Sequence, residues 1–103
     1  MTTWNRVAGD VDDTIDAVLN GVTDLTAATA VEGHVWHGRE TPVTLTGSVV
    51  SASERRVRIN LGSWLALASA RSYSFEIQVS FGTTVITWPE DKPDEIRVRS
   101  QGA

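Results

Sequence analysis

The side chains best suited to metal binding are two histidines and an acidic run, and neither set has the spacing that a metal site needs. His34 and His37 are three residues apart in a segment whose alternation predicts a strand, so their side chains should point to opposite faces. Metal ligands must instead converge on one point. The acidic residues between positions 10 and 16 lack the glycine and the terminal glutamate of a calcium-binding loop. We therefore expect neither a metal ion nor a cofactor.

The residue types needed for nucleophilic catalysis also lack their usual settings. The sequence contains no Gly-x-Ser-x-Gly motif, in which a serine is exposed on a sharp turn, and no glycine-rich loop that would bind a phosphate. It contains no cysteine, which excludes thiolate catalysis, disulfide bonds and cysteine-bound zinc. We expect no catalytic residue, and the sequence predicts a protein that is not an enzyme.

The 103 residues include four tryptophans, a high number for a chain of this length. Trp36 and Trp88 lie at the ends of predicted strands or fall out of phase with the residues that point into the core. Such positions favour a core edge or a protein interface, where aromatic residues are enriched. A stacking platform for sugar rings is the alternative interpretation. The candidate interface residues are therefore Trp4, Trp36, Trp64 and Trp88.

Four arginines alternate with apolar residues and are predicted to point outward from two strands. Arg56 and Arg58 belong to one strand, and Arg97 and Arg99 belong to another. If these strands are neighbours in a sheet, the arginines form a basic stripe that can bind an acidic protein surface. A solvated face that discourages aggregation is the simpler interpretation. We include the four arginines among the candidate interface residues.

Composition limits the classes of partner. The net charge is −4 at pH 7, which disfavours nucleic-acid binding because nucleic-acid binders usually carry a basic excess. No run of about 18 apolar residues is present, so we expect no contact with a membrane. The N-terminal residues lack the apolar stretch of a signal peptide, so we expect synthesis and folding in a cytoplasm.

Short segments rich in valine, threonine and isoleucine alternate apolar and polar residues, which is typical of half-buried strands. The clearest example is the segment 73–81, which alternates strictly along its whole length. Gly82 and Thr83 then predict a hairpin turn into the next strand. A bulge at Gly47 is predicted to let one strand continue past it. The predicted strands cover residues 29–36, 43–52, 56–61, 73–81, 84–88 and 95–99.

Two segments are less regular. Residues 10–21 fit a helix, because their apolar residues share one helical face, and equally fit a strand over residues 14–19 that ends at an Asn-Gly turn. The alanine-rich segment 63–70 predicts a short helical turn. About seven or eight short strands predict an all-β fold, a two-sheet antiparallel sandwich with at most one short helix, in one domain over residues 1–103. A small open barrel is the second choice.

Short motifs at strand starts and turns follow one another in a characteristic order. They are Arg-Val-Ala-Gly-Asp at 6–10, Asp-Leu-Thr-Ala-Ala-Thr at 24–29, Val-Thr-Leu-Thr-Gly at 43–47, Arg-Val-Arg-Ile at 56–59, Tyr-Ser-Phe-Glu at 73–76 and Thr-Trp-Pro-Glu at 87–90. This order resembles the small Ig-like β-sandwich of tailed-phage structural proteins, in particular the N-terminal domain of upper baseplate proteins. Ala27 stands where that family often has glycine. The resemblance implies that residues 10–21 form a strand.

The resemblance also implies a function. We expect a bacteriophage virion structural protein, made in the host cytoplasm, that binds other virion proteins such as major capsid or tail proteins and forms homo-oligomers in the particle. Because the chain is short and no receptor-binding region follows residue 103, capsid decoration or a minor capsid role is favoured slightly over a tail or baseplate role. The alternative is a carbohydrate-binding module that recognises cell-surface glycans.

Overall fold

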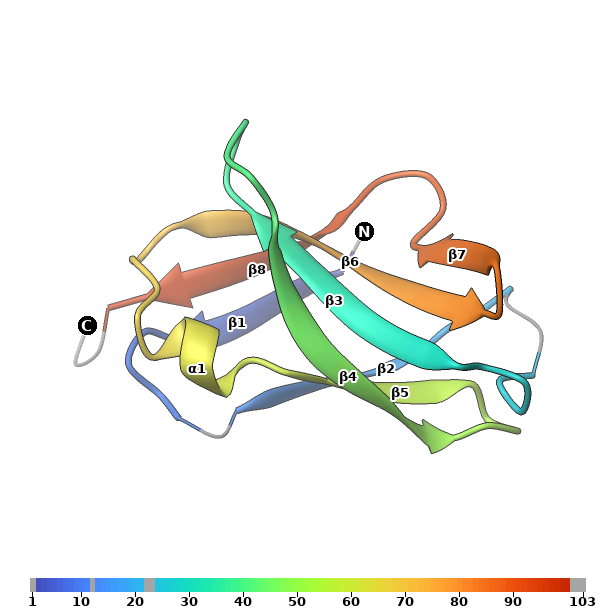
Figure 1. Cartoon of the computed structure of the whole chain (residues 1–103). Helices are drawn as coiled ribbons and strands as arrows, with labels where there is room; N and C mark the ends of the chain where they lie inside the picture. The colour runs from blue at the N-terminus through green and yellow to red at the C-terminus, as the bar shows by residue number, and fades with distance from the viewer. Residues whose placement is uncertain (1, 12, 22–23, 101–103) are drawn as a thin grey trace.

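The computed structural model describes residues 2–11, 13–21 and 24–100, and over these residues it has eight strands and one short helix (Figure 1). No helix in this part of the chain is both long enough and apolar enough to cross a membrane. In chain order the elements are β1 (Thr3–Val7), β2 (Thr14–Val18), β3 (Ala30–Trp36), β4 (Val43–Ser51), β5 (Arg56–Asn60), α1 (Gly62–Leu65), β6 (Ser72–Phe81), β7 (Thr84–Trp88) and β8 (Asp94–Arg99).

The strands form one mixed sheet that curls until it nearly closes into a barrel. Neighbouring strands follow the order β1-β8-β6-β3-β4-β5-β2, and β7 pairs with the C-terminal end of β6. β1 and β8 are parallel, whereas the other pairs are antiparallel. Figure 1 shows β4 running diagonally across the molecule between β3 and β5. The core fills the space that this curled sheet encloses.

The all-β prediction is confirmed, but the two-sheet antiparallel sandwich is wrong. β4 pairs with β3 through its first half and with β5 through its second half, so one strand joins what would have been two separate sheets. β1 adds to β8 in parallel, which the alternation of residues within a strand cannot reveal. The second choice, a small open barrel, is closer to the observed architecture.

Most predicted elements are confirmed, with ends within one residue of those expected. The helical turn predicted in the segment 63–70 spans Gly62–Leu65. Gly82, at a φ of 65°, turns β6 into β7, as the hairpin prediction required. β1 was not predicted, because its five residues carry no clear alternation of apolar and polar side chains.

The segment at residues 10–21 contains strand β2, and its described residues form no helix. Ile15, Ala17 and Leu19 are buried, whereas Asp16 between them is exposed. This period of two is the period of a strand, and β5 supplies the hydrogen-bonding partner. The strand alternative is therefore confirmed.

Two glycines let β5 approach the β3–β4 pair closely. A Cβ added to Gly33 would lie 2.7 Å from Cγ2 of Ile59. A Cβ added to Gly47 would lie 2.7 Å from Cδ1 of Ile59 and 3.0 Å from the carbonyl oxygen of Val31. Ile59 is fully buried, so it has little space into which it can retreat. The two glycines therefore permit the tight curvature with which the sheet wraps around its core.

The predicted bulge at Gly47 is wrong. Gly47 lies opposite Ile59 in the register of β4 and β5, and the irregularity occurs further along, between Val49 and Ser51. A glycine within a strand can mark either a bulge or a close approach of another part of the chain. Here it marks a close approach, and only the tertiary structure separates the two cases.

The open seam of the barrel lies between β1 and β2, and Arg6 spans it. Nη2 of Arg6 donates a hydrogen bond to the carbonyl oxygen of Thr14 over 3.0 Å. Nε of Arg6 lies 3.3 Å from Oδ2 of Asp13. The guanidinium carbon lies 6.0 Å from the centre of the Trp4 ring, at the limit of a cation–π contact. One partly buried arginine thus links the two end strands of the sheet.

A cross-strand ion pair between β2 and β5 gives a pH-dependent prediction. Asp16 lies opposite Arg58, and its carboxylate accepts hydrogen bonds from Nε and Nη2 over 2.8 and 2.9 Å. This hydrogen bonding lowers the pKa of Asp16 below its usual value. The pair therefore stabilises the fold above the unfolded-state pKa of Asp16, and this contribution is lost as the pH falls through the lower folded-state pKa.

We expect Asp16→Asn to lower the free energy of unfolding by less than about 1 kcal/mol at pH 7, because both side chains are partly exposed and water screens the pair. Urea unfolding of wild type and variant at several pH values is the measurement. The difference between the two proteins should disappear in acid, below the folded-state pKa of Asp16. A difference that persists there would mean that the ion pair is not its cause.

Candidate protein-binding groove

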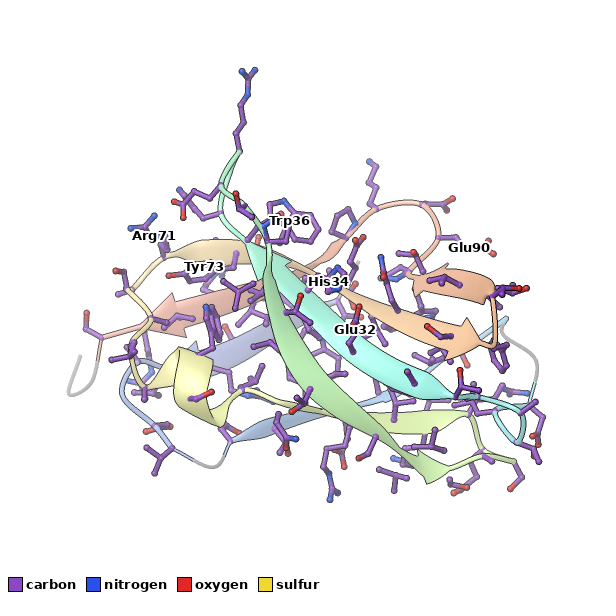
Figure 2. The ribbon with its side chains drawn as sticks, in the orientation of Figure 1. Glu32, His34, Trp36, Arg71, Tyr73 and Glu90 are labelled. Carbon is purple, nitrogen blue, oxygen red and sulfur yellow. The ribbon has the colours of Figure 1, made fainter. Side chains whose placement is uncertain are left out.

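A groove of about 520 Å³ opens between the β3–β4 hairpin and the loop that connects α1 to β6. Trp36, Trp64 and Tyr73 form the aromatic part of its lining, and Leu67 adds an aliphatic side chain. Figure 2 shows Arg71 and Tyr73 on one side of the hairpin and Trp36 at its base on the other side. Leu67 is 90% exposed, whereas the three aromatic side chains are half-buried. The groove is therefore a partly apolar surface that is open to solvent.

The aromatic residues reach the groove from three different elements. Trp36 is the last residue of β3, where it lies opposite Ser74 of β6 and shares the outer face with His34. Tyr73 belongs to β6, and Trp64 belongs to the single turn of α1. The rings of Trp64 and Tyr73 meet edge to face, with 4.9 Å between their centres and 81° between their planes. This packing fixes both rings at the base of the groove.

Hydrogen bonds hold the aromatic cluster in place. The hydroxyl of Tyr73 donates to the carbonyl oxygen of Ser69 over 3.0 Å, which ties the loop after α1 to β6. Nδ1 of His37 lies 3.0 Å from the carbonyl oxygen of Ser72, and the His37 ring also meets the Tyr73 ring edge-on at 6.1 Å. The hairpin turn and the loop are thus both anchored to the start of β6. A preformed site of this kind loses little conformational entropy when a partner binds.

A charged pair crosses one side of the groove. Nη1 of Arg71 lies 3.3 Å from Oε1 of Glu40, which joins the loop before β6 to the turn between β3 and β4. Both side chains are exposed, so the pair contributes little to stability. Polar groups around an apolar centre are the usual anatomy of a protein interface, in which the rim orients the partner and the centre supplies most of the affinity.

The angle between the Trp64 and Tyr73 rings is relevant to the alternative that this protein binds carbohydrate. Stacking of a sugar ring needs an exposed aromatic face, and a longer glycan needs two such faces side by side. Because Trp64 and Tyr73 pack edge to face, they do not form a flat tandem platform.

The structure divides the four candidate tryptophans into two groups. Trp36 and Trp64 line the groove together, and Trp64 also packs against the core as a partly buried side chain. Trp4 lies opposite Ile96 of β8, and Trp88 lies opposite Ile77 of β6, so both pack against the core as partly buried side chains. The sequence alone does not separate the four tryptophans, because tryptophan occurs both at core positions and at surface positions.

Sequence reasoning missed two groove residues. Tyr73 has the phase of the core-facing residues of its strand and packs against the core as a half-buried side chain, and it also lines the groove, which the alternation does not reveal. Leu67 lies in the alanine-rich segment 63–70, for which the sequence predicts only a short helical turn. A large apolar residue just after a short helical turn is the sequence signal that could have identified Leu67 as a binding residue. The helix ends at Leu65, and Leu67 is exposed in the loop that follows.

The predicted basic stripe is wrong, because its two strands are not neighbours. β5 and β8 are separated in the sheet by β4, β3 and β6. Arg58 instead pairs with Asp16 of β2, and Nη2 of Arg97 lies 3.0 Å from Oε1 of Glu95 on its own strand. Within the described residues, the four candidates Arg56, Arg58, Arg97 and Arg99 therefore do not form one surface.

The two histidines have separate partners. Figure 2 shows Glu32, His34 and Trp36 in succession along β3, and Nε2 of His34 lies 3.0 Å from Oε1 of Glu32. His37 contacts the start of β6 at the groove. Over the residues that the structure describes, no group of three or more His, Cys, Asp and Glu side chains is arranged to hold a metal ion.

This chain matches no family model and no curated protein.

Proposed function

We propose that this domain is a structural protein of a bacteriophage virion and that it binds another virion protein through the groove lined by Trp36, Trp64 and Leu67. Capsid decoration or a minor capsid role is our first choice, and a tail or baseplate role is the second. The observation that carries the proposal is the groove itself, an aromatic centre with an exposed leucine and a charged rim. The order of motifs that resembles tailed-phage structural domains supplies the class of partner.

The groove combines an exposed aliphatic side chain with aromatic side chains, and both kinds of residue contribute to binding affinity. Burying an exposed leucine side chain contributes on the order of 2 kcal/mol through the hydrophobic effect. Tryptophan is among the residues that most often dominate the affinity of a protein interface. The anchoring of Tyr73 and His37 means that these surfaces are in place before the partner arrives. A side chain of the partner inserted between the hairpin and the loop would lie against Trp64, Leu67 and Tyr73, which line this part of the groove.

Mass spectrometry of purified particles tests the proposal. The particles are those of the phage that encodes this chain, and their heads and tails are separated before digestion. We expect the chain in stoichiometric amounts in the head fraction. Its recovery only in tails would support the second choice. Its absence from both fractions, with the protein present in the lysate of infected cells, would contradict a virion function.

A glycan array tests the carbohydrate alternative on the same protein. We expect no saturable binding to cell-surface glycans. Binding that is lost in Trp36→Ala, with the fold intact by circular dichroism, would contradict the proposal and establish the groove as a sugar site.

A further inference from the structure

Among the described residues, one edge of the sheet is left without a pairing strand. β1 and β2 end the main order of strands, and Arg6 spans the seam between them. β7 is different, because it pairs with β6 on one side only. In the described part of the chain, no other backbone hydrogen bond involves residues 84–88. Figure 1 shows β7 lying outside β6 at the periphery of the molecule. In an antiparallel pair, alternate residues of an edge strand direct their N–H and C=O groups away from the neighbour, so β7 has unused backbone groups.

Within its five residues β7 carries none of the charges, prolines or bulges that protect many edge strands, although Pro89 follows it directly. Natural edges carry charges, prolines or bulges that prevent pairing with another chain. β1 carries Arg6 and β2 carries Asp16, but the five residues of β7 include no charged residue, no proline and no glycine. Its register with β6 is regular over its whole length. Val85, which points away from the core, is 54% exposed.

We propose that β7 pairs in antiparallel fashion with β7 of a second copy of this chain, around a two-fold axis at Ile86. This inference stands apart from the proposed function, because it uses a different surface and makes no assumption about the virion. In this arrangement the sequence of β7 pairs with the same sequence running in the opposite direction, and the facing residues match well. Ile86 lies opposite Ile86 of the copy, and Val85 lies opposite Thr87 of the copy. Three of the five pairs therefore match β-branched residues, which favour cross-strand packing.

The absence of charge around β7 permits a second copy of this chain as the occupant. The protein carries a net charge of −4, so two copies repel each other unless they meet at a neutral surface. β7 is neutral, and its outward residues Val85 and Thr87 lie beside Ser80 and Gln78 of β6, which are also neutral. The two-fold pairing brings these uncharged rows together and joins two β6–β7 hairpins into one sheet across the axis.

Sedimentation equilibrium of the full chain at concentrations up to about 1 mM tests the dimer. We expect the wild type to show a monomer–dimer equilibrium. Val85→Lys with Thr87→Lys places two introduced lysines opposite each other in this register, and we expect dimerisation to weaken by tenfold or more. Val85→Lys with Thr87→Glu places opposite charges across the axis, and we expect it to dimerise within about threefold of wild type. Val50→Lys, a matched change on exposed β4, should leave the equilibrium unchanged.

Three outcomes would overturn the proposal. The first is a wild type that remains monomeric over the whole concentration range. The second is a dimer that the double-lysine variant leaves intact, which would place the interface elsewhere. The third is equal loss of dimer in both double variants, which would exclude the register. Circular dichroism melting of each variant checks that its monomer is folded, and a variant that fails this check is replaced by Val85→Lys alone, for which we expect weakened dimerisation.

Discussion

Gly47→Ala is expected to lower the free energy of unfolding by about 2–3 kcal/mol, which is a large share of the stability of a small domain. The added Cβ would lie 2.7 Å from Cδ1 of Ile59 and 2.9 Å from Cγ1 of Val31. It would also lie 3.0 Å from the carbonyl oxygen of Val31, which cannot move without shifting β3. β4 must therefore shift away from Val31 and Ile59 around Gly47. Chemical denaturation monitored by tryptophan fluorescence measures the change.

A matched control and a relief variant make this prediction specific. Ser48→Ala changes the next residue of β4, which is exposed, and should alter stability by no more than about 0.5 kcal/mol. Ile59→Val removes the methyl group nearest to the added Cβ. In the Gly47→Ala background it should cost less than in the wild type, where deleting this methyl costs about 1 kcal/mol. Simple additivity of the two changes would show that Gly47 does not act by making room for Ile59.

The second large effect is expected on the affinity of the groove for its partner. Trp36→Ala and Leu67→Asp are each expected to weaken binding to particles assembled without the protein by about 30-fold, the factor that corresponds to about 2 kcal/mol. Leu67 is 90% exposed, so its replacement should leave the melting temperature almost unchanged. Co-sedimentation of labelled protein with such particles measures the affinity.

Val50→Asp is the control for this measurement, because Val50 is 45% exposed and lies near the end of β4 that is remote from the groove. It introduces the same charge as Leu67→Asp and should leave binding unchanged. If Val50→Asp and Leu67→Asp weakened binding equally, the loss would reflect net charge and not the groove.

The strands themselves could be predicted because each one carries its own signal. In β6, apolar residues from Phe75 to Val79 alternate with polar ones, and the buried face follows that alternation. The β6–β7 hairpin could be predicted from the Gly-Thr turn between two such runs. The segment 10–21 could not be assigned from its pattern, because its apolar residues fit both the helical period and the strand period. Its pairing with β5 makes it a strand.

The closure of the sheet could not be predicted in the same way. It depends on β4 pairing with two different strands along its length and on the match of Gly33 and Gly47 to Ile59. β3, β4 and β5 follow one another in the sequence, but these relations depend on how the three strands pair and pack in space, and no residue pattern within one strand encodes them. The separation of Arg56 and Arg58 from Arg97 and Arg99 has the same origin.

Part of the groove was visible in the sequence. The position of Trp36, out of phase with the buried residues of β3, predicted a side chain at the surface, and it lines the groove. Trp88 was assigned to the same class but points toward Ile77 and the core. Trp88 faces the core because of the register between β6 and β7, and this register cannot be predicted from the residue type. Tyr73 and Leu67 join the site only through the loop after α1.

Cryo-electron microscopy of the phage particle tests the central claim most directly, because it shows both the location of the domain and the surface it uses. The account predicts a copy of this domain on the head, or on the tail under the second choice, with Trp36 and Leu67 buried against a neighbouring virion protein. Particles that lack the domain, or that hold it with the groove open to solvent and another face in contact, would contradict the account.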